Sequence, residues 1–175
     1  MLVEFLLKLD GEILLFIQEF LRFQWLTKIM KLITTLGDGG MIWLILATIL
    51  LCMKRQRKTG TAMAVALLLG YVITNLLLKN LVMRPRPYET VAGLQSLIGV
   101  VPGSSFPSGH TTSSIAASIV MLTGKYKYLG TIAFVLAILI SFSRMYLGVH
   151  YPTDVLAGVL VGVFAAFSAK HIIKA

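Results

Sequence analysis

The chain has 175 residues, of which 57% are hydrophobic and 13% are charged. An ordinary soluble domain carries about 25% charged residues, so this composition excludes a water-soluble globular protein and indicates a lipid bilayer as the solvent. The net charge of +9 comes from short basic clusters between long uncharged segments, which argues against nucleic-acid binding. The single cysteine, Cys52, excludes an internal disulfide and a cysteine-based metal site. No cleavable signal peptide is expected, because Glu4 and Asp10 interrupt the start of the chain.

The first 37 residues predict two amphipathic helices. Apolar residues recur at helical spacing in both halves, but Glu19, Arg22, Lys28 and Lys31 interrupt any continuous apolar segment. We therefore expect residues 1–37 to lie in the outer membrane interface. A sixth membrane span in this part of the chain is the competing interpretation.

Further along the chain, five segments predict membrane-spanning helices. Twenty helical residues rise about 30 Å, enough to cross the hydrocarbon core, and shorter segments span if terminal Lys and Arg side chains extend to the interface. Four segments contain no Asp, Glu, Lys or Arg: residues 39–53, 59–78, 128–143 and 155–169. In the charge-free residues 90–124, glycines and prolines predict a loop, followed by a helix from about Ser108 to Thr123.

The basic residues predict the orientation of these spans. They cluster after the first, third and fifth spans: Lys54, Arg55, Arg57 and Lys58; Lys125 and Lys127; Lys170 and Lys174. Positive charge marks the cytoplasmic side, so the C-terminus is expected in the cytoplasm. The predicted fold is all-α: one polytopic helix bundle in the cell membrane, residues 1–175, with five or six spans in total and the spanning core in residues 38–175. Five aromatic residues are expected in interfacial belts: Trp25, Trp43, Tyr126, Tyr128 and Tyr146.

Charged and imidazole side chains gather at the opposite, outer ends of the spans. Such groups are costly in a membrane, so they point to function by default. Six of them fall at or beside span ends on this face: Lys79, Arg86, His110, Arg144, His150 and Asp154. Three cations, two imidazoles and a carboxylate are the composition of an oxyanion site.

Two short motifs sharpen this prediction. In residues 107–110 (Pro-Ser-Gly-His), proline and serine are typical of a helix start, where unpaired backbone amides bind phosphate. Asp154 follows His150 by four residues. If a helix starts here, its carboxylate reaches one imidazole nitrogen and leaves the other free to attack an electrophile.

The same residues resemble the active-site pattern of the type 2 phosphatidic acid phosphatases, which is shared with vanadium haloperoxidases. The resemblance covers residues 79–154 and consists of three motifs in the family order. These are Lys79 with Arg86-Pro87, then residues 107–110, then Ser143-Arg144 with His150 and Asp154. Arg84-Pro85 is a second Arg-Pro pair, two residues out of this register.

The resemblance implies a role for each residue. His150 is the nucleophile, Asp154 orients it, and His110 is the general acid. The implied phosphate-binding residues are Lys79, Arg86, Ser108, Gly109 and Arg144.

Both arguments predict hydrolysis of a lipid phosphate through a phosphohistidine. No metal or cofactor is expected, because Asp154 is the only acidic residue within the motifs. The expected partners are membrane lipids and a lipid phosphate substrate, ranked as undecaprenyl diphosphate before phosphatidic acid and phosphatidylglycerol phosphate. Two alternatives remain at this point: an anion transporter or channel, and a haloperoxidase-like vanadate enzyme. The sequence does not predict the oligomeric state.

Overall fold

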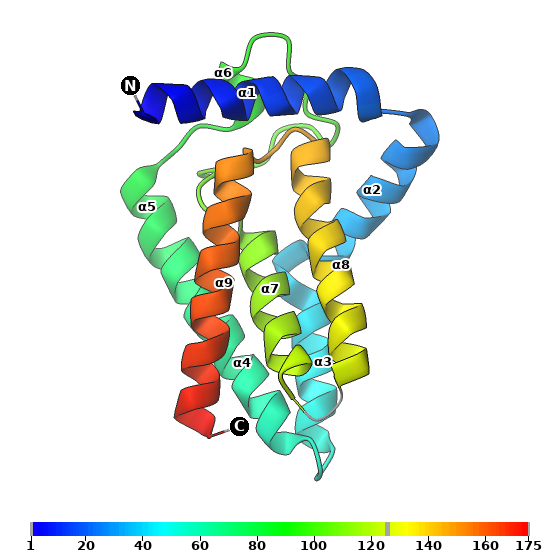
Figure 1. Ribbon diagram of the computed structural model, residues 1–175, viewed down its shortest axis with the longest axis vertical. Coiled ribbons are helices and arrows are strands. Elements are labelled where there is room, and N and C mark those ends of the chain that lie inside the picture. The colour runs from blue at the N-terminus through cyan, green and yellow to red at the C-terminus, as the bar shows by residue number, and fades with distance from the viewer. Residues whose placement is uncertain (1, 125–126, 175) are drawn as a thin grey trace.

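A computed structural model describes residues 2–124 and 127–174, and all regular elements in these residues are helices (Figure 1). In chain order they are α1 (Leu2–Leu21), α2 (Gln24–Leu36), η1 (Asp38–Gly40), α3 (Met41–Cys52), α4 (Arg57–Tyr71), the π-helical η2 (Val72–Leu78), α5 (Lys79–Val82), α6 (Pro87–Thr90), α7 (Gly109–Leu122), α8 (Lys127–Tyr146) and α9 (Pro152–Ile173). The predicted helical class is confirmed for the described residues.

Three helical segments are long and apolar enough to cross a membrane: Arg57–Thr90, Lys127–Tyr146 and Pro152–Ile173. A fourth candidate is the pair Gln24–Leu36 and Asp38–Cys52, which is bent by 42° at its break. The 14-residue α7 is shorter than these spans, yet it packs against α3, α4, α8 and α9 in the middle of the bundle. The chain is therefore a membrane helical bundle built around α7.

Small residues let α9 approach α7 closely. A Cβ atom added at Gly158 would lie 2.8 Å from the Ser108 carbonyl oxygen, and one at Gly162 would lie 2.9 Å from the Thr112 carbonyl oxygen. Both distances are below any real contact of a Cβ atom, so the two helix backbones touch. This contact sets the start of α9 beside the start of α7, where the Ser108 amide donates to the Asp154 carbonyl oxygen at 3.1 Å.

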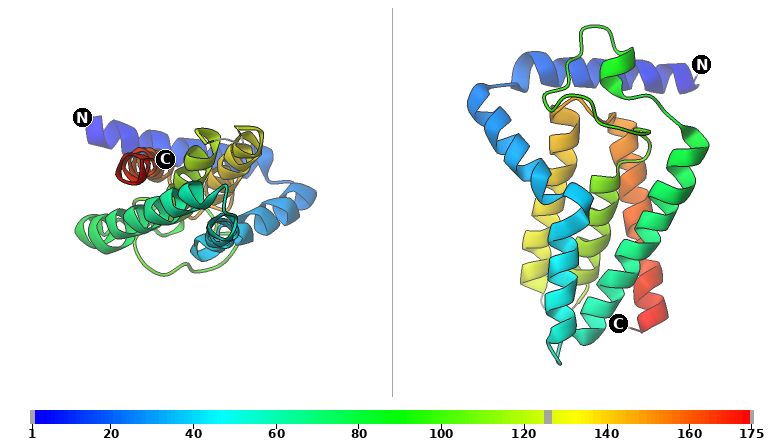
Figure 2. Two further views of the ribbon diagram at one scale, coloured as in Figure 1. Left: turned by 90° about the horizontal axis from the view of Figure 1, so that it is seen from below. Right: turned by 180° about the vertical axis from the view of Figure 1, so that it is seen from behind.

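The helix α1 lies across one end of the bundle rather than along it (Figures 1 and 2). Its inward face has helical spacing: Asp10, Leu14 and Ile17 are 2%, 0% and 4% exposed. Phe5 and Phe16 are exposed on the same helix. The structure thus places an acidic residue on the buried face of α1.

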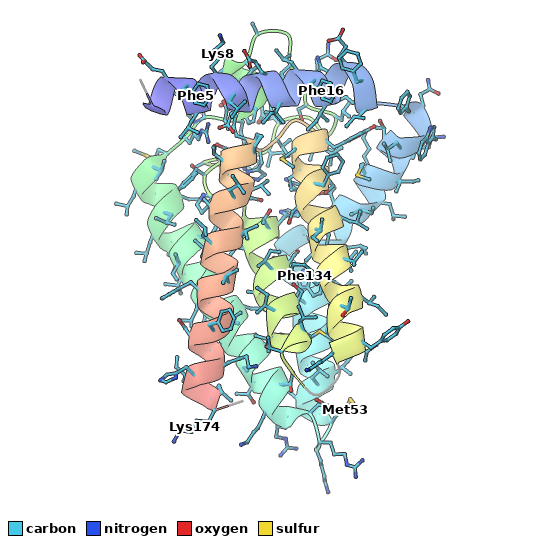
Figure 3. All side chains as sticks on the ribbon, in the orientation of Figure 1. Phe5, Lys8, Phe16, Met53, Phe134 and Lys174 are labelled. Atoms are coloured by element: carbon cyan, nitrogen blue, oxygen red, sulfur yellow. The ribbon has the colours of Figure 1, made fainter. Side chains whose placement is uncertain are left out.

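The basic clusters lie at the other end of the bundle. Figure 3 shows Met53 and Lys174 at the end opposite α1. Residues 53–56 connect α3 to α4 at this end, Arg57 and Lys58 begin α4, and Lys127 begins α8 there. Lys125, which belongs to the same predicted cluster, lies outside the described residues.

The helix predicted from Ser108 to Thr123 is confirmed, with these two residues as its N-cap and C-cap. The expectation of aromatic belts changes in part. Trp25 and Tyr128 are 63% and 79% exposed, whereas Trp43 and Tyr146 are 1% and 0% exposed, and Tyr126 lies outside the described residues. The polar atoms of the two buried side chains find partners inside the bundle, where the Trp43 indole donates to the Ser114 hydroxyl at 2.9 Å.

The helix α2 is oriented differently from α1. It packs against α8 and continues through η1 into α3, so it descends beside the bundle (Figure 1). Its buried residues, Met30 and Thr34, face this packing. The two helices are therefore placed differently: α1 lies across one end of the bundle, whereas α2 packs along its side against α8.

Candidate active site

A cavity of about 580 Å³ lies where the predicted motifs meet. Six of the eight predicted site residues line it: Lys79, Arg86, Gly109, His110, Arg144 and His150. Ser108 and Asp154 do not line it and are fully buried. The structure therefore brings residues from α5, α7, α8 and the connections between helices into one site.

The His150 imidazole is held from two sides. An N–H of the Arg86 guanidinium donates to His150 Nε2 at 3.1 Å. A guanidinium is always a donor, so Nε2 is the unprotonated ring nitrogen and Nδ1 carries the hydrogen. Nδ1 lies 3.4 Å from Asp154 Oδ2, although the alignment is too poor for a hydrogen bond. In this arrangement the lone pair of Nε2 accepts the hydrogen bond from Arg86.

Burial also sets the charge of this ring. His150 is 2% exposed, and burial lowers the pKa of its imidazole to about 3, against the opposing effect of Asp154. A neutral imidazole is the nucleophilic form. The resting site thus holds His150 in the tautomer and charge state that an attack by Nε2 requires.

Arg86 connects this histidine to the loop that precedes α7. Its other donors reach the carbonyl oxygens of Gly103 at 3.1 Å, Pro102 at 3.2 Å and Val149 at 3.0 Å. Arg86 is 3% exposed, so its charge is buried among these acceptors and the cavity. The residue links the cavity wall to the connection that carries His150.

Asp154 lies in the first turn of α9, where proline and a capping carboxylate start the helix. Its Oδ2 accepts the Tyr151 amide at 2.9 Å, and its Oδ1 accepts an Arg84 N–H at 2.7 Å. Its side chain is 0% exposed. A buried carboxylate needs such donors, and these leave Oδ2 facing His150.

His110 lies in the first turn of α7 with its ring at the cavity. His110 Nε2 lies 2.9 Å from Asp38 Oδ1, which comes from η1 at the start of α3. Its side chain is 17% exposed, compared with 3% for His150. The two histidines therefore each face a carboxylate, and the more accessible ring is His110.

The remaining cations complete a positive lining. Arg144 projects from α8, where its Nη1 donates to the Thr34 hydroxyl at 2.5 Å and its Nε has no partner among the described residues. Lys79 follows the π-helical η2, and its ammonium lies 3.9 Å from the position of a Cβ added at Gly109. Gly109 therefore leaves its backbone open to the same cavity.

Three side chains at the site were not predicted from the sequence. Asp38 faces His110, and Asp10 and Arg84 connect to Asp154. Arg84 was noted in the sequence but set aside because it falls out of register. Asp10 contacts Thr153, which is 143 residues away in the chain, and Asp38 contacts His110, which is 72 residues away. No local sequence pattern indicates contacts between residues so far apart.

A family model matches the part of the chain that carries the motifs. Residues 59–175 match the model described as the PAP2 superfamily. The chain belongs to the PAP2 superfamily. The match covers all three motifs and leaves α1, α2 and α3 outside it.

Curated relatives support this membership. An undecaprenyl-diphosphatase of Sulfolobus acidocaldarius is 30% identical over 131 residues, covering 75% of this chain and 63% of the relative. The undecaprenyl-diphosphatase BcrC of Bacillus subtilis is 33% identical over 142 residues, covering 81% of this chain and 72% of the relative. The chain thus spans less than two thirds of the length of the Sulfolobus protein.

A solved structure shows the same architecture. The crystal structure of LpxE from Aquifex aeolicus superimposes with a TM-score of 0.82 at 26% identity, covering 91% of this chain and 93% of that one. This PAP2 chain therefore shares nearly its whole described fold, including the region before residue 59, with a solved relative.

Proposed function

We propose that this PAP2 protein hydrolyses the phosphate ester or diphosphate of a membrane lipid. The observation that carries the proposal is the composition of the cavity wall. The cations and the two histidines form a polar part of the wall, and apolar side chains of α3 and α4 form another part: Leu44, Ala64, Leu67, Leu68 and Tyr71. Leu44, Leu68 and Tyr71 are also 49–62% exposed, so the apolar part reaches the outer surface of the bundle.

This layout fits an amphipathic substrate. A phosphate group at the polar part of the wall would accept hydrogen bonds from Lys79, Arg86 and Arg144. The attached chain would leave between α3 and α4, which lie next to each other in the bundle (Figure 2). A soluble phosphate ester would leave that apolar wall without a partner, so the cavity favours a lipid.

The reaction that we propose proceeds in two steps. His150 Nε2 attacks phosphorus, the bond from phosphorus to the leaving oxygen breaks, and His110 gives that oxygen a proton. A water molecule then attacks the phosphohistidine, gives a proton to His110, and releases phosphate as the bond to Nε2 breaks. Asp154 stabilises the imidazolium that exists between the two steps.

Ser108 has a separate role in this proposal. Its hydroxyl accepts the Thr111 amide at 3.4 Å and the Thr111 hydroxyl at 3.0 Å. It therefore caps α7, while the backbone at Gly109 faces the cavity. We expect the helix start, rather than the Ser108 hydroxyl, to contact the phosphate.

We rank undecaprenyl diphosphate as the first substrate candidate, since both curated relatives described above are named for it. The test is phosphate release by the purified protein from undecaprenyl diphosphate, phosphatidic acid and phosphatidylglycerol phosphate, with p-nitrophenyl phosphate as the tail-free control. We expect at least one lipid to be hydrolysed faster than this control, with or without EDTA. No release from any lipid, or a loss in EDTA that Mg²⁺ restores, would contradict the proposal.

The active site is proposed to face the outside of the cell, because the basic clusters lie at the other end of the bundle. We expect a Val100→Cys variant to react with an impermeant thiol reagent in intact cells and an Arg55→Cys variant to react after lysis. Val100 is 84% exposed in the loop on the active-site end, and Arg55 is exposed at the basic end. Both changes are made with Cys52, which is exposed, replaced by serine. Labelling of Arg55→Cys in intact cells would show that the basic end faces outside, which contradicts the proposed orientation.

A further inference from the structure

Asp10 makes an unusual contact for a residue on an amphipathic helix. Its side chain is 3% exposed, and its Oδ1 accepts the Thr153 amide of α9 at 3.0 Å. Its Oδ2 accepts the Thr153 hydroxyl and an Arg84 N–H, the latter at 2.8 Å. A buried carboxylate is retained at a site like this only with such donors, so α1 is anchored by charge to the first turn of α9.

Arg84 joins this carboxylate to the candidate active site. One terminal nitrogen contacts Asp10, and the other contacts Asp154 Oδ1 at 2.7 Å. The Arg84 side chain is 14% exposed, and its guanidinium carbon lies over the Tyr151 ring, 3.7 Å from the ring centre. Its planar fork suits two carboxylates held at fixed positions, which a lysine ammonium would not match. The contacts run from Asp10 through Arg84 and Asp154 to His150.

The charges along this chain of contacts matter for the proposed reaction. Asp154 is the one carboxylate that the described residues place within ion-pair distance of His150. Arg84 by itself would cancel the charge of Asp154. Asp10 cancels the charge of Arg84 instead, so the group keeps a net negative charge beside His150. That charge balances the imidazolium formed when Nε2 bonds to phosphorus.

We propose that Asp10 and Arg84 are positioning residues that act on His150 through Asp154, which makes α1 part of the active site. The inference rests on the proposed function, because it concerns the imidazolium of the phosphohistidine. Asp10 lies outside the segment that matches the family model, which begins at residue 59. The role of α1 is therefore not contained in the three motifs.

The test separates charge from shape. Asp10→Asn keeps the shape and removes the charge, whereas Asp10→Glu keeps the charge and changes the shape. We expect Asp10→Asn to lower kcat by about 10- to 100-fold with KM changed less than about twofold, and Asp10→Glu to retain more activity. The substrate is the lipid that the wild-type protein hydrolyses fastest in the panel above. A role in folding alone predicts the opposite order, since asparagine fits the buried site better.

A double variant provides the sharper measurement. Asp10→Asn combined with Arg84→Gln removes one charge of each sign, so the net charge beside His150 returns to its wild-type value. We expect the double variant to recover kcat by about fivefold or more over Asp10→Asn. Glu12→Gln is the matched control on α1, because Glu12 is 61% exposed and pairs with Lys8 at 3.8 Å on the outer surface.

Two results would overturn the inference. One is a kcat for Asp10→Asn within about twofold of the wild type. The other is a loss that the double variant does not relieve, with thermal unfolding showing that both variants are folded. If Asp10→Asn does not fold, the double variant is compared with Arg84→Gln. An Asp10 that acts through Arg84 predicts that the two kcat values agree within about twofold, and a further loss of about tenfold or more would overturn the inference. A wild-type protein that releases no phosphate from any lipid would instead refute the proposed function.

Discussion

Replacing His150 with alanine is expected to reduce phosphate release by about 10⁴-fold or more, because the proposed reaction loses the atom that bonds to phosphorus. His110 cannot substitute, since its Nε2 is directed at Asp38 from another helix. The protein should remain folded, because the side chain points into a cavity rather than into the packed core. The measurement is kcat for the best lipid of the panel, with thermal unfolding on the same preparation.

His171→Ala is the control for this prediction. His171 is exposed near the end of α9, far from the cavity, and should leave kcat unchanged. Turnover by His150→Ala within about tenfold of the wild type would exclude His150 as the nucleophile.

Asp154→Asn is the second large expected effect. Asparagine keeps the size of the side chain and can still cap α9 by accepting the Tyr151 amide. It removes the negative charge, however, and its amide would face either Arg84 or Nδ1 of His150. We expect kcat to fall by about 10²- to 10⁴-fold with a smaller effect on KM.

Glu89→Gln is the matched control for Asp154→Asn. Glu89 caps α6 as Asp154 caps α9, accepting the Arg86 amide at 2.9 Å, and it contacts no histidine in the described structure. The control therefore measures what loss of a capping charge costs in thermal stability. If Asp154→Asn keeps wild-type turnover, Asp154 caps the helix and does not orient His150.

Local signals in the sequence predicted the parts of the site that depend on neighbouring residues. The start of α7 was predicted to within one residue, because Pro107, Ser108 and Gly109 each favour a helix start for their own reasons. The spacing of four between His150 and Asp154 likewise predicted their approach, which the structure shows at 3.4 Å. Such pairs follow from helix geometry alone.

The partners of these residues could not be predicted in this way. Asp10 occupies the buried face of α1, but the sequence does not tell which face of an amphipathic helix packs, nor against which end of the bundle. Arg84 was not included among the site residues because it lies two residues out of the motif register. Its contacts with Asp10 and Thr153 depend on α1 and α9 meeting around it, which the sequence does not indicate. Tertiary contacts, rather than helix periodicity, determine these positions.

Tertiary contacts also explain why the expectation for Trp43 was wrong. Trp43 lies in an apolar segment near a predicted span end, which is typical of an interfacial residue. Its indole N–H instead reaches Ser114 in α7, and the ring fills the space between the helices. A buried tryptophan needs such a partner, and the partner lies 71 residues away in the chain.

The most direct test of the account is to trap the covalent intermediate. The wild-type protein is mixed with ³²P-labelled lipid substrate, quenched in alkali within the first turnover, and digested to locate the label. A phosphohistidine is stable in alkali and labile in acid, so we expect label on the peptide that contains His150, lost on acidification and absent from His150→Ala. Label on any other residue, or full turnover by a protein that never carries label, would contradict a phosphohistidine at His150.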